Sequence, residues 1–377
     1  MKINLVMIVK NEERSLGQCL EQAGGLVDEI VIADTGSTDR SVEIARKYGA
    51  KVWEYGWKDD FAAARNFALR HSDAEWNLIL DADEYLLPCS REKLERQIYD
   101  YSARYGGRWI GSLLRRDFWK EEGRTESSLT YLPRLLPRRA CYFGIIHEQP
   151  EETGPFLKLP LEAEHDGYLY TDKSRRNLEY LKKAVRYYPE DMYYRFQMAV
   201  TLRNANMSQE SLFWFREFYN NASRKSGYWS EGVVSYLYAL LESGTQSGLS
   251  EAFAVVKREQ SYMQDQADFW FVCGLFYMKL VLSDVSLYIE FLPRIEDSFL
   301  ECLRIGERPG GVTGTGSFKA AYNLALWYEV SGQTEKAVKY YKDAAASFEP
   351  AGERLKMLIF KNTYVFNEYA DIKTYGI

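Results

Sequence analysis

Residues 1–88 alternate short, continuously apolar runs with stretches of helical period, and this alternation constrains the fold more than any other feature. The apolar runs lack the polar residue at every second position that marks a half-exposed strand. They therefore suit strands covered on both faces, as in a parallel sheet, whose ligands bind at the carboxyl ends of the strands. The predicted strands are Asn4–Val9, Glu29–Ala33, Lys51–Tyr55 and Trp76–Leu80, with helices predicted at Arg14–Gln22, between Asp39 and Gly49, and at Ala62–His71.

After residue 108 the pattern changes twice. Arg-rich strands predicted at Trp109–Leu114, Leu129–Leu136 and Cys141–Ile146 indicate an antiparallel annex, and helical period dominates from Lys173 onward. We predict an α/β domain over residues 1–172 and an all-α repeat domain over residues 173–377. The small-and-large spacing of a tetratricopeptide repeat is found at Leu324, Ala325, Tyr328, Gly332, Ala337, Tyr341, Ala344 and Pro350.

Charge and cysteine usage exclude several classes of protein. The 377 residues carry a net charge of −6, so no overall positive field attracts nucleic acid or an anionic membrane. The five cysteines lack C-x-x-C spacing, which argues against a disulfide framework or a zinc site and favours a cytoplasmic location. The longest apolar stretch, Phe269–Met278, is half a membrane span, and Leu5–Val9 is too short for a signal-peptide core.

Acidic residues gather where the predicted strands end. Asp34 ends the second strand, Asp60 follows the third, and Asp81-Ala82-Asp83 ends the fourth. Two carboxylates separated by one residue at a strand end share a rim, where a divalent ion with oxygen ligands can bridge them to a diphosphate. Asp-x-Asp alone is more often a solvated turn, and its position after an apolar strand makes a metal and nucleotide site the stronger interpretation.

Four runs in fixed order carry a resemblance to a known family: MIVKNEE (Met7–Glu13), DEIVIADTGSTD (Asp28–Asp39), DDFAAARNFAL (Asp59–Leu69) and LILDADE (Leu78–Glu84). The chain resembles the family 2 glycosyltransferases of GT-A fold. With RLLPRRACYFGIIHEQP (Arg134–Pro150) and the later repeats, it is similar to a bacterial subgroup that includes the peptide S-glycosyltransferases of sublancin-type bacteriocins. The resemblance implies a Rossmann-like GT-A domain followed by a tetratricopeptide-like domain.

The resemblance also implies which residues bind the nucleobase of the donor. In the family this is done by the loop after the first strand and the acid after the second, which here are Ile8, Lys10, Asn11 and Asp34. Many members have two acids where this chain has Asp34-Thr35, so which of these two positions meets the base stays open.

The remaining donor-binding residues follow from the same resemblance. Asp60 and Arg65 correspond to residues that line the nucleotide pocket, and Arg65 suits a phosphate because a guanidinium is a planar multiple donor. Asp81 is expected to face the ribose and Asp83 the metal ion, with Ala82 between them in the donor-binding segment.

The catalytic base is expected near the end of the third Arg-rich strand. Glu148 occupies the place where GT-A enzymes carry the acid that deprotonates the acceptor, as inverting transfer requires. His165 matches a later histidine that completes the metal shell in many such enzymes. His147, beside Glu148, could take either role, and a hydrogen-bonded framework role is the alternative for both histidines.

The expected activity is metal-dependent, inverting transfer of a sugar from a nucleoside diphosphate sugar to a peptide side chain. We expect a UDP-sugar as donor, Mg²⁺ or Mn²⁺ as the ion, and cysteine as a candidate acceptor. One alternative is transfer to a cell-surface saccharide or another small acceptor; another is a non-catalytic repeat scaffold with a nucleotide-binding domain. A nucleotidylyltransferase would normally carry a Gly-rich loop where this chain has Lys10–Arg14, without glycine.

Consecutive aromatic residues mark the helical half of the chain, as in Phe213-Trp214-Phe215, Tyr236-Leu237-Tyr238 and Phe269-Trp270-Phe271. Neighbouring positions on a helix point about 100° apart, so such residues cannot all face one side. We expect them either to fill the grooves between hairpins or to lie in an interface. Such an interface would join two chains into a homodimer through the repeats, or it would bind the acceptor peptide.

Overall fold

The computed structural model describes residues 1–121, 123–151, 154–167 and 174–360. The chain divides into two compact units, Met1–Ala205 and Asn206–Ile377. The predicted domain boundary, between residues 172 and 173, lies outside the described residues. The two helices that follow it belong to the first unit.

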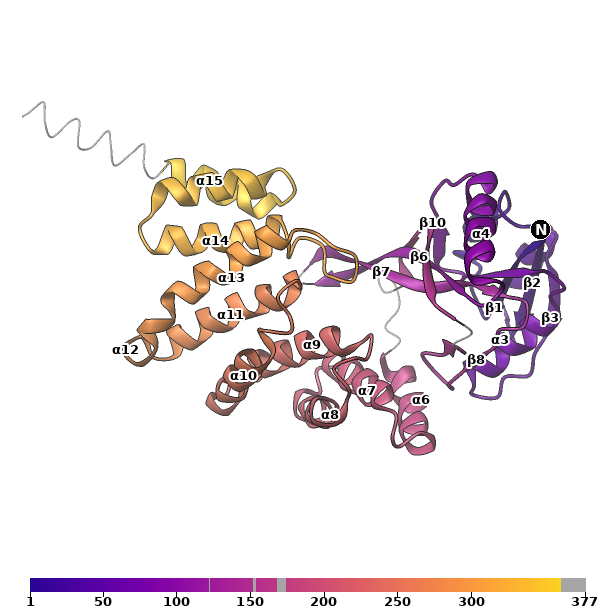
Figure 1. The fold of residues 1–377 in the computed structure, drawn as a ribbon, viewed down its shortest axis with the longest axis horizontal. Helices are drawn as coiled ribbons and strands as arrows, with labels where there is room; N and C mark the ends of the chain where they lie inside the picture. Colours follow the sequence, from indigo (N-terminus) through magenta and orange to yellow (C-terminus); the bar gives the residue numbers. More distant parts are fainter. Residues whose placement is uncertain (122, 152–153, 168–173, 361–377) are drawn as a thin grey trace, which may run out of the picture. The chain divides into compact units, whose positions relative to one another are not determined.

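In the first unit the described residues form an eight-stranded sheet with the order β3-β2-β1-β4-β7-β6-β10-β5 (Figure 1). The four strands predicted from the first apolar runs are all present and pair in parallel. The strands are β1 (Ile3–Val9), β2 (Glu29–Asp34), β3 (Lys51–Glu54), β4 (Trp76–Ile79), β5 (Glu84–Leu86), β6 (Ile110–Glu121), β7 (Arg124–Pro137) and β10 (Phe156–His165), with β8 (Tyr142–Phe143) and β9 (Gln149–Pro150) paired separately.

The first two Arg-rich strands, β6 and β7, pair antiparallel as predicted, but they extend the main sheet instead of forming an annex. The third, predicted at Cys141–Ile146, is the short β8, which pairs antiparallel with β9 outside the main sheet. β7 pairs with β4 through Leu78 opposite Leu135, and β6 pairs with β7 along most of its length. β10, which apolar periodicity did not predict, then pairs in parallel with β6. This extension brings the end of β10 to the same sheet as the acids that follow β4.

Both faces of the sheet are covered, as the continuous apolar runs predicted. Leu5 and Met7 of β1 pack into one core, whereas Val6 packs into a second core on the opposite face. Helix α4 lies over the first face and α3 over the second (Figure 1). The helices of this unit are α1 (Leu16–Ala23), α2 (Ser41–Lys47), α3 (Phe61–Arg70), α4 (Arg91–Tyr105), α6 (Ser174–Tyr187) and α7 (Met192–Asn204).

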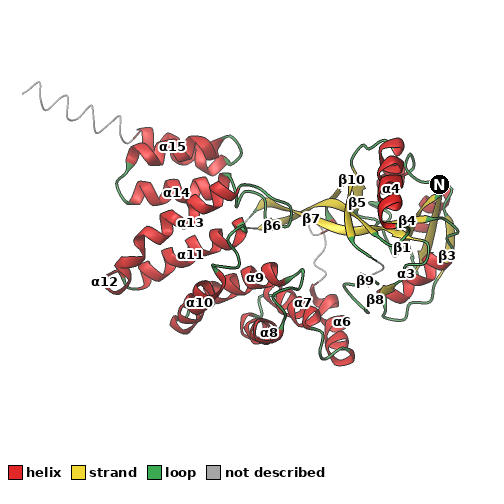
Figure 2. Cartoon of the chain, viewed as in Figure 1, coloured by secondary structure: helices red, strands yellow, loops and turns green. Residues whose placement is uncertain are grey.

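The second unit is helical, and its last hairpin confirms the predicted repeat. The predicted small and large positions on α14 and α15 are buried, and Gly332 in the turn between them has φ +76°, a left-handed conformation that favours glycine. Figure 2 shows α13, α14 and α15 side by side. The elements are α8 (Ser208–Asn221), α9 (Trp229–Glu242), α10 (Gln246–Glu259), α11 (Ala267–Ser283), α12 (Val285–Tyr288), η1 (Ile289–Phe291), α13 (Leu292–Ile305), α14 (Phe318–Val330) and α15 (Thr334–Ala345).

Most of the consecutive aromatic residues lie in the interior of the second unit. Phe215, Tyr236, Phe269 and Phe271 are buried, and of the three aromatic runs only Phe213 is exposed. These rings therefore fill the grooves between helices, and the homodimer stays a prediction without support from them.

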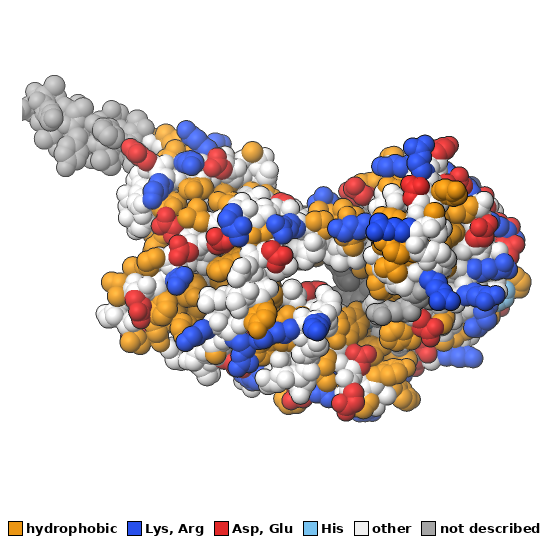
Figure 3. Space-filling model, viewed as in Figure 1, with side chains coloured by type: hydrophobic (Ala, Val, Ile, Leu, Met, Phe, Trp, Pro, Cys, Tyr) orange, Lys and Arg blue, Asp and Glu red, His pale blue; other side chains and the backbone are white. Residues whose placement is uncertain are grey.

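Side chains of both charges lie on the visible face of each unit (Figure 3). None of the helices in the described part of the chain is both long enough and apolar enough to cross a bilayer.

We predict that a fragment of residues 1–205 has a higher urea midpoint than a fragment of residues 1–172. The shorter fragment loses the contacts of α6 with the loop after β3, where Tyr180 Oη lies 3.1 Å from Trp57 Nε1 and Lys183 Nζ lies 2.7 Å from Asp59 Oδ2. Circular dichroism during urea unfolding measures both midpoints. Equal midpoints would show that α6 and α7 do not stabilise the sheet domain.

Candidate active site

The acids predicted from the sequence lie together at the carboxyl edge of the parallel strands. Asp34 is the last residue of β2, and Asp81 and Asp83 lie in the turn that joins β4 to β5. Glu84 closes this turn, because its carboxylate accepts from the Asp81 N–H at 3.1 Å and its own N–H donates to the Asp81 carbonyl at 3.0 Å. The backbone of the Asp-x-Asp segment is therefore held by the residue that follows it.

A buried guanidinium connects Asp81 with Glu148. Arg65 lies on α3, with Nη2 2.6 Å from Asp81 Oδ1 and Nε 2.5 Å from Glu148 Oε1. The Arg65 side chain is 6% exposed, and its Nη1 atom is buried without a hydrogen-bond partner among the described residues. The structure thus brings together three residues that the sequence predicted, although Arg65 here contacts carboxylates and not an open phosphate pocket.

Two further arginines, which sequence reasoning did not single out, continue this network. Arg134 of β7 donates to Asp81 Oδ2 at 3.0 Å and to Glu84 Oε1 at 2.5 Å. Arg115 of β6 donates to the same Glu84 oxygen at 2.6 Å. The sequence signal for them was the Arg-rich composition of these predicted strands.

The arginines keep the Asp81 carboxylate ionised. Burial alone would raise the pKa of Asp81, but Arg65 and Arg134 outweigh burial and hold this pKa well below its usual range. Removing one member of such a buried network leaves an uncompensated charge, which typically costs about 3 to 5 kcal/mol.

His165 lies at the end of β10, beside the second acid of the Asp-x-Asp segment. Its Nε2 atom is 3.4 Å from Asp83 Oδ2, and its Nδ1 atom is 2.7 Å from Asp117 Oδ1 on β6. Burial alone would lower the pKa of His165, but the hydrogen bonds to Asp117 and Asp83 raise it to about 9. His147 makes no contact with Asp83 in the described residues, so His165 is the histidine that the fold places at this acid.

The pair Asp83 and His165 fits a divalent ion in chemistry and in spacing. Donors that share an ion at about 2.1 Å lie roughly 3 Å apart, and the 3.4 Å between Asp83 Oδ2 and His165 Nε2 is close to this. Gly167 keeps the space beside them open, because a Cβ there would collide with Asp83 Oδ2 and lie 2.7 Å from His165 Nε2. Among the described residues no group of three or more His, Cys, Asp and Glu is placed to hold an ion, so any ion here would need ligands beyond the described His, Cys, Asp and Glu side chains.

The loops after β1 and β2, predicted to bind the nucleobase, are tied to each other. The Asn11 side chain accepts from the Thr38 N–H at 2.7 Å, and the Asn11 N–H donates to Ser37 Oγ at 3.0 Å. Asp34 is buried and accepts from the N–H groups of Gly36 and Ser37. Asn11 has φ +55°, a conformation that this short polar residue tolerates better than most.

The other predicted donor-binding residues have mixed environments. Lys10 is exposed and Ile8 is half-buried. Asp60 caps α3, because its side chain accepts from the Ala63 N–H at 2.8 Å, and Ala82 is buried between the two acids. Their roles toward a nucleotide stay predictions.

The loop that carries Glu148 is fastened to α3. Asn66 exchanges two hydrogen bonds of 2.8 Å with the backbone of Tyr142, and the Phe61 N–H donates to the Ile145 carbonyl at 3.0 Å. His147 has φ +50°, and its Nε2 atom is buried with no hydrogen-bond partner in the part of the chain that the structure describes. Such strained backbone is retained where the surrounding contacts over-determine it, as happens at functional sites.

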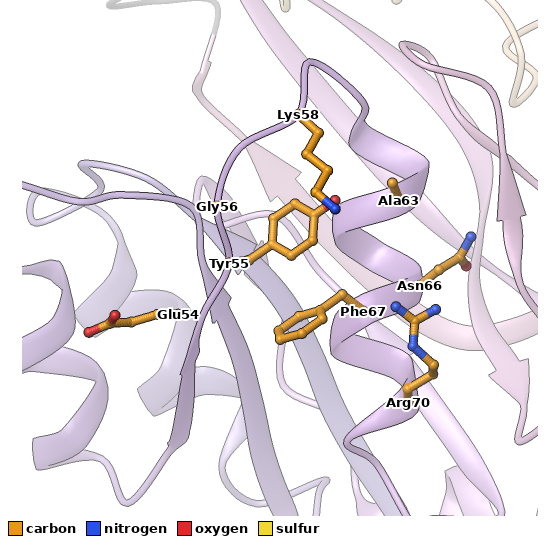
Figure 4. Close-up of a pocket in the computed structure, with 8 residues that line it drawn as sticks. All are labelled: Glu54, Tyr55, Gly56, Lys58, Ala63, Asn66, Phe67 and Arg70. Atoms are coloured by element: carbon orange, nitrogen blue, oxygen red, sulfur yellow. The ribbon is translucent and has the colours of Figure 1, made fainter.

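A separate open hollow of about 550 Å³ lies between α3 and residues 54–58, at the end of β3 and in the loop after it (Figure 4). Tyr55 and Phe67 form its apolar wall, and Lys58 and Arg70 lie at its rim. None of its lining residues belongs to the charged network, so this hollow is distinct from the candidate active site.

We predict that His147 makes the protein acid-sensitive. Burial lowers the pKa of His147 to about 4, below its ordinary value of about 6.5. The unfolded chain therefore takes up this proton more readily, and the stabilisation is complete above pH 6.5 and is lost as the pH falls toward 4. The free energy of unfolding of His147→Asn should fall less than that of the wild type between pH 7.5 and 5, by about 2 kcal/mol. Asparagine is chosen because it tolerates the positive φ of this position. Urea unfolding at the two pH values measures the free energies, and an equal decrease in the wild type and in His147→Asn would contradict the prediction.

Comparison with known proteins gives a family match for the N-terminal part of the chain. The family described as Glycosyl transferase family 2 matches residues 5–148. The SPbeta prophage-derived glycosyltransferase SunS of Bacillus subtilis is 24% identical over 228 residues, which are 57% of this chain and 52% of that protein.

Other similarities concern repeat proteins. A TPR repeat-containing protein of Synechococcus elongatus is 42% identical over 97 residues, which are 26% of this chain and 24% of that protein. A solved TPR protein of Thermus thermophilus has a TM-score of 0.37 and 16% identity, with 50% of this chain and 91% of that chain covered. The chain thus spans about a quarter and about half of the length of the two sequence relatives.

Proposed function

Because residues 5–148 form a glycosyl transferase family 2 domain, as the four sequence motifs predicted, we propose that this chain is a glycosyltransferase. It transfers a sugar from a nucleoside diphosphate sugar, with inversion, to a nucleophile on an acceptor. The donor we propose is a UDP-sugar, bound together with Mg²⁺ or Mn²⁺.

The observation that carries this proposal is that Asp83 and His165 lie next to each other. Two parts of the chain that are far apart in sequence place a carboxylate oxygen and an imidazole nitrogen 3.4 Å from each other at the carboxyl edge of the sheet. This is the edge at which α/β sheets bind their ligands. Asp83 and His165 would hold the ion, which would supply neutralisation of the charge on the leaving diphosphate.

Glu148 is the general base that we propose. Arg65 Nε contacts Glu148 Oε1, while Arg65 Nη2 contacts Asp81. One guanidinium thus fixes the spacing between the proposed base and the acid proposed to face the ribose of the donor. Holding reacting groups at a fixed separation lowers the entropy cost of transfer, and the second oxygen of Glu148 is the one that would take the acceptor proton.

The acceptor we propose is a peptide side chain, with cysteine first, because of the resemblance to the peptide S-glycosyltransferases. A thiol has a pKa of about 8.5, so it needs only modest help from a base. A saccharide or small-molecule acceptor is the second candidate. Mass spectrometry after incubation with nucleotide sugars and thiol, hydroxyl and saccharide acceptors distinguishes the two.

We predict that UDP with Mn²⁺ raises the melting temperature of the wild type, because a ligand bound only by the folded state stabilises it. At a hundredfold excess over Kd the gain is about 2.7 kcal/mol, which corresponds to a shift of a few degrees. In Asp83→Asn the part of the shift that depends on Mn²⁺ should disappear, while the exposed control Asp100→Asn should behave as the wild type. Scanning fluorimetry measures the shift, and equal shifts with and without Mn²⁺ in the wild type would overturn the metal assignment.

We predict that Glu148→Gln keeps UDP binding within about threefold and lowers transfer about a hundredfold or more. Glutamine retains an oxygen that can accept from Arg65 but cannot take a proton at neutral pH. Glu151→Gln, at a nearby exposed position, is the matched control. Steady-state transfer kinetics decide the matter, and unchanged turnover in Glu148→Gln would assign the base to another residue.

A further inference from the structure

Asp117 lies directly beside the proposed metal-binding histidine. It is 8% exposed on β6, inside the sheet. Its Oδ1 atom accepts from His165 Nδ1 at 2.7 Å and from Arg115 Nη2 at 2.8 Å. An ionised carboxylate can only accept hydrogen bonds.

The contact follows from the pairing of three strands. His165 of β10 is opposite Asp117 of β6 in the parallel pair and opposite Glu84 of β5 in the antiparallel pair. Directly opposed residues project to the same face of a sheet. The register of β10 therefore places the imidazole between two acids, while Arg115 contacts both Asp117 and Glu84.

This arrangement decides which nitrogen of His165 faces the acid of the Asp-x-Asp segment. Because the Asp117 carboxylate accepts a hydrogen bond from Nδ1–H, the neutral ring carries its proton on Nδ1 and its lone pair on Nε2. Nε2 is the atom that lies 3.4 Å from Asp83 Oδ2 and next to the space that Gly167 leaves open. A carboxylate behind the histidine is a common means of orienting a metal ligand.

We propose that Asp117 is a positioning residue, which fixes the ring orientation and the tautomer of His165 so that Nε2 points to the metal ion beside Asp83. The proposal rests on the proposed function, since it concerns the ion of the same site. Its competitor is a structural role in which Asp117 only balances the charge of Arg115.

The first experiment measures binding of Mn²⁺ to the full chain in the presence of UDP, by isothermal titration calorimetry. Asp117→Ala should weaken Mn²⁺ binding about tenfold to a hundredfold, whereas Asp117→Asn should recover part of this loss because its amide oxygen can accept from Nδ1. Asp100→Asn, exposed on α4, is the control and should bind as the wild type. Circular dichroism confirms folding, and Asp117→Asn compared with His165→Asn decides the matter if Asp117→Ala does not fold.

The second experiment reports the tautomer, which a structural role would not change. The chain has three histidines, so long-range ¹H–¹⁵N spectra of the Mg²⁺-loaded protein can resolve each ring. The wild type should show His165 protonated at Nδ1, and Asp117→Ala should lose this signature.

The outcomes separate the two proposals. If the wild type binds no Mn²⁺, the metal part of the proposed function fails. If the wild type binds Mn²⁺, His165→Asn loses it, and the Asp117 variants bind within threefold of the wild type with an unchanged tautomer, the positioning role is wrong while the proposed function stands.

Discussion

One buried guanidinium holds the two halves of the candidate site together. Arg65 comes from α3, and its partners Asp81 and Glu148 come from the end of β4 and from the loop after β8. The three side chains compensate one another in a place with little access to water, where an unpaired charge would be costly. The position of the proposed base therefore depends on the same residue that holds the first acid of the Asp-x-Asp segment. Arg134 extends this arrangement to Glu84, so the turn after β4 is fixed from two sides.

The network is not electrically balanced. Its acids are more numerous than its arginines, and Asp83, at one end of the network, lies beside His165. Negative charge therefore remains where the cation is proposed to bind. The tightly paired charges make the site rigid. Asp83, in contrast, can pair either with the protonated His165 or with a metal ion.

Backbone strain is concentrated in the same region. Within the first unit, non-glycine residues with positive φ are found at Asn11, Asp59 and His147. They lie in the loops after β1 and β3 and in the loop between β8 and β9. Asn11 is held by Thr38 and Asp59 by Lys183. The loops at this edge are thus shaped by contacts with segments far along the chain, which explains how irregular backbone can keep a defined form.

The sequence by itself determined the parallel α/β core, the helical second half and the repeat in its last hairpin. Those features depend on apolar periodicity, which is local and survives in a single sequence. It also predicted that Asp34, Asp81 and Asp83 share one edge, because carboxyl ends of parallel strands must meet there.

The tertiary structure was needed to show that Arg115, Arg134 and Asp117 belong to the site. It also showed that Arg65 bridges two acids, and that His165 and not His147 lies at Asp83. These facts depend on the register between β10 and β6 and on the pairing of β7 with β4. Strand pairing between distant segments is set by the packing of the whole sheet, and no local pattern in the chain encodes it.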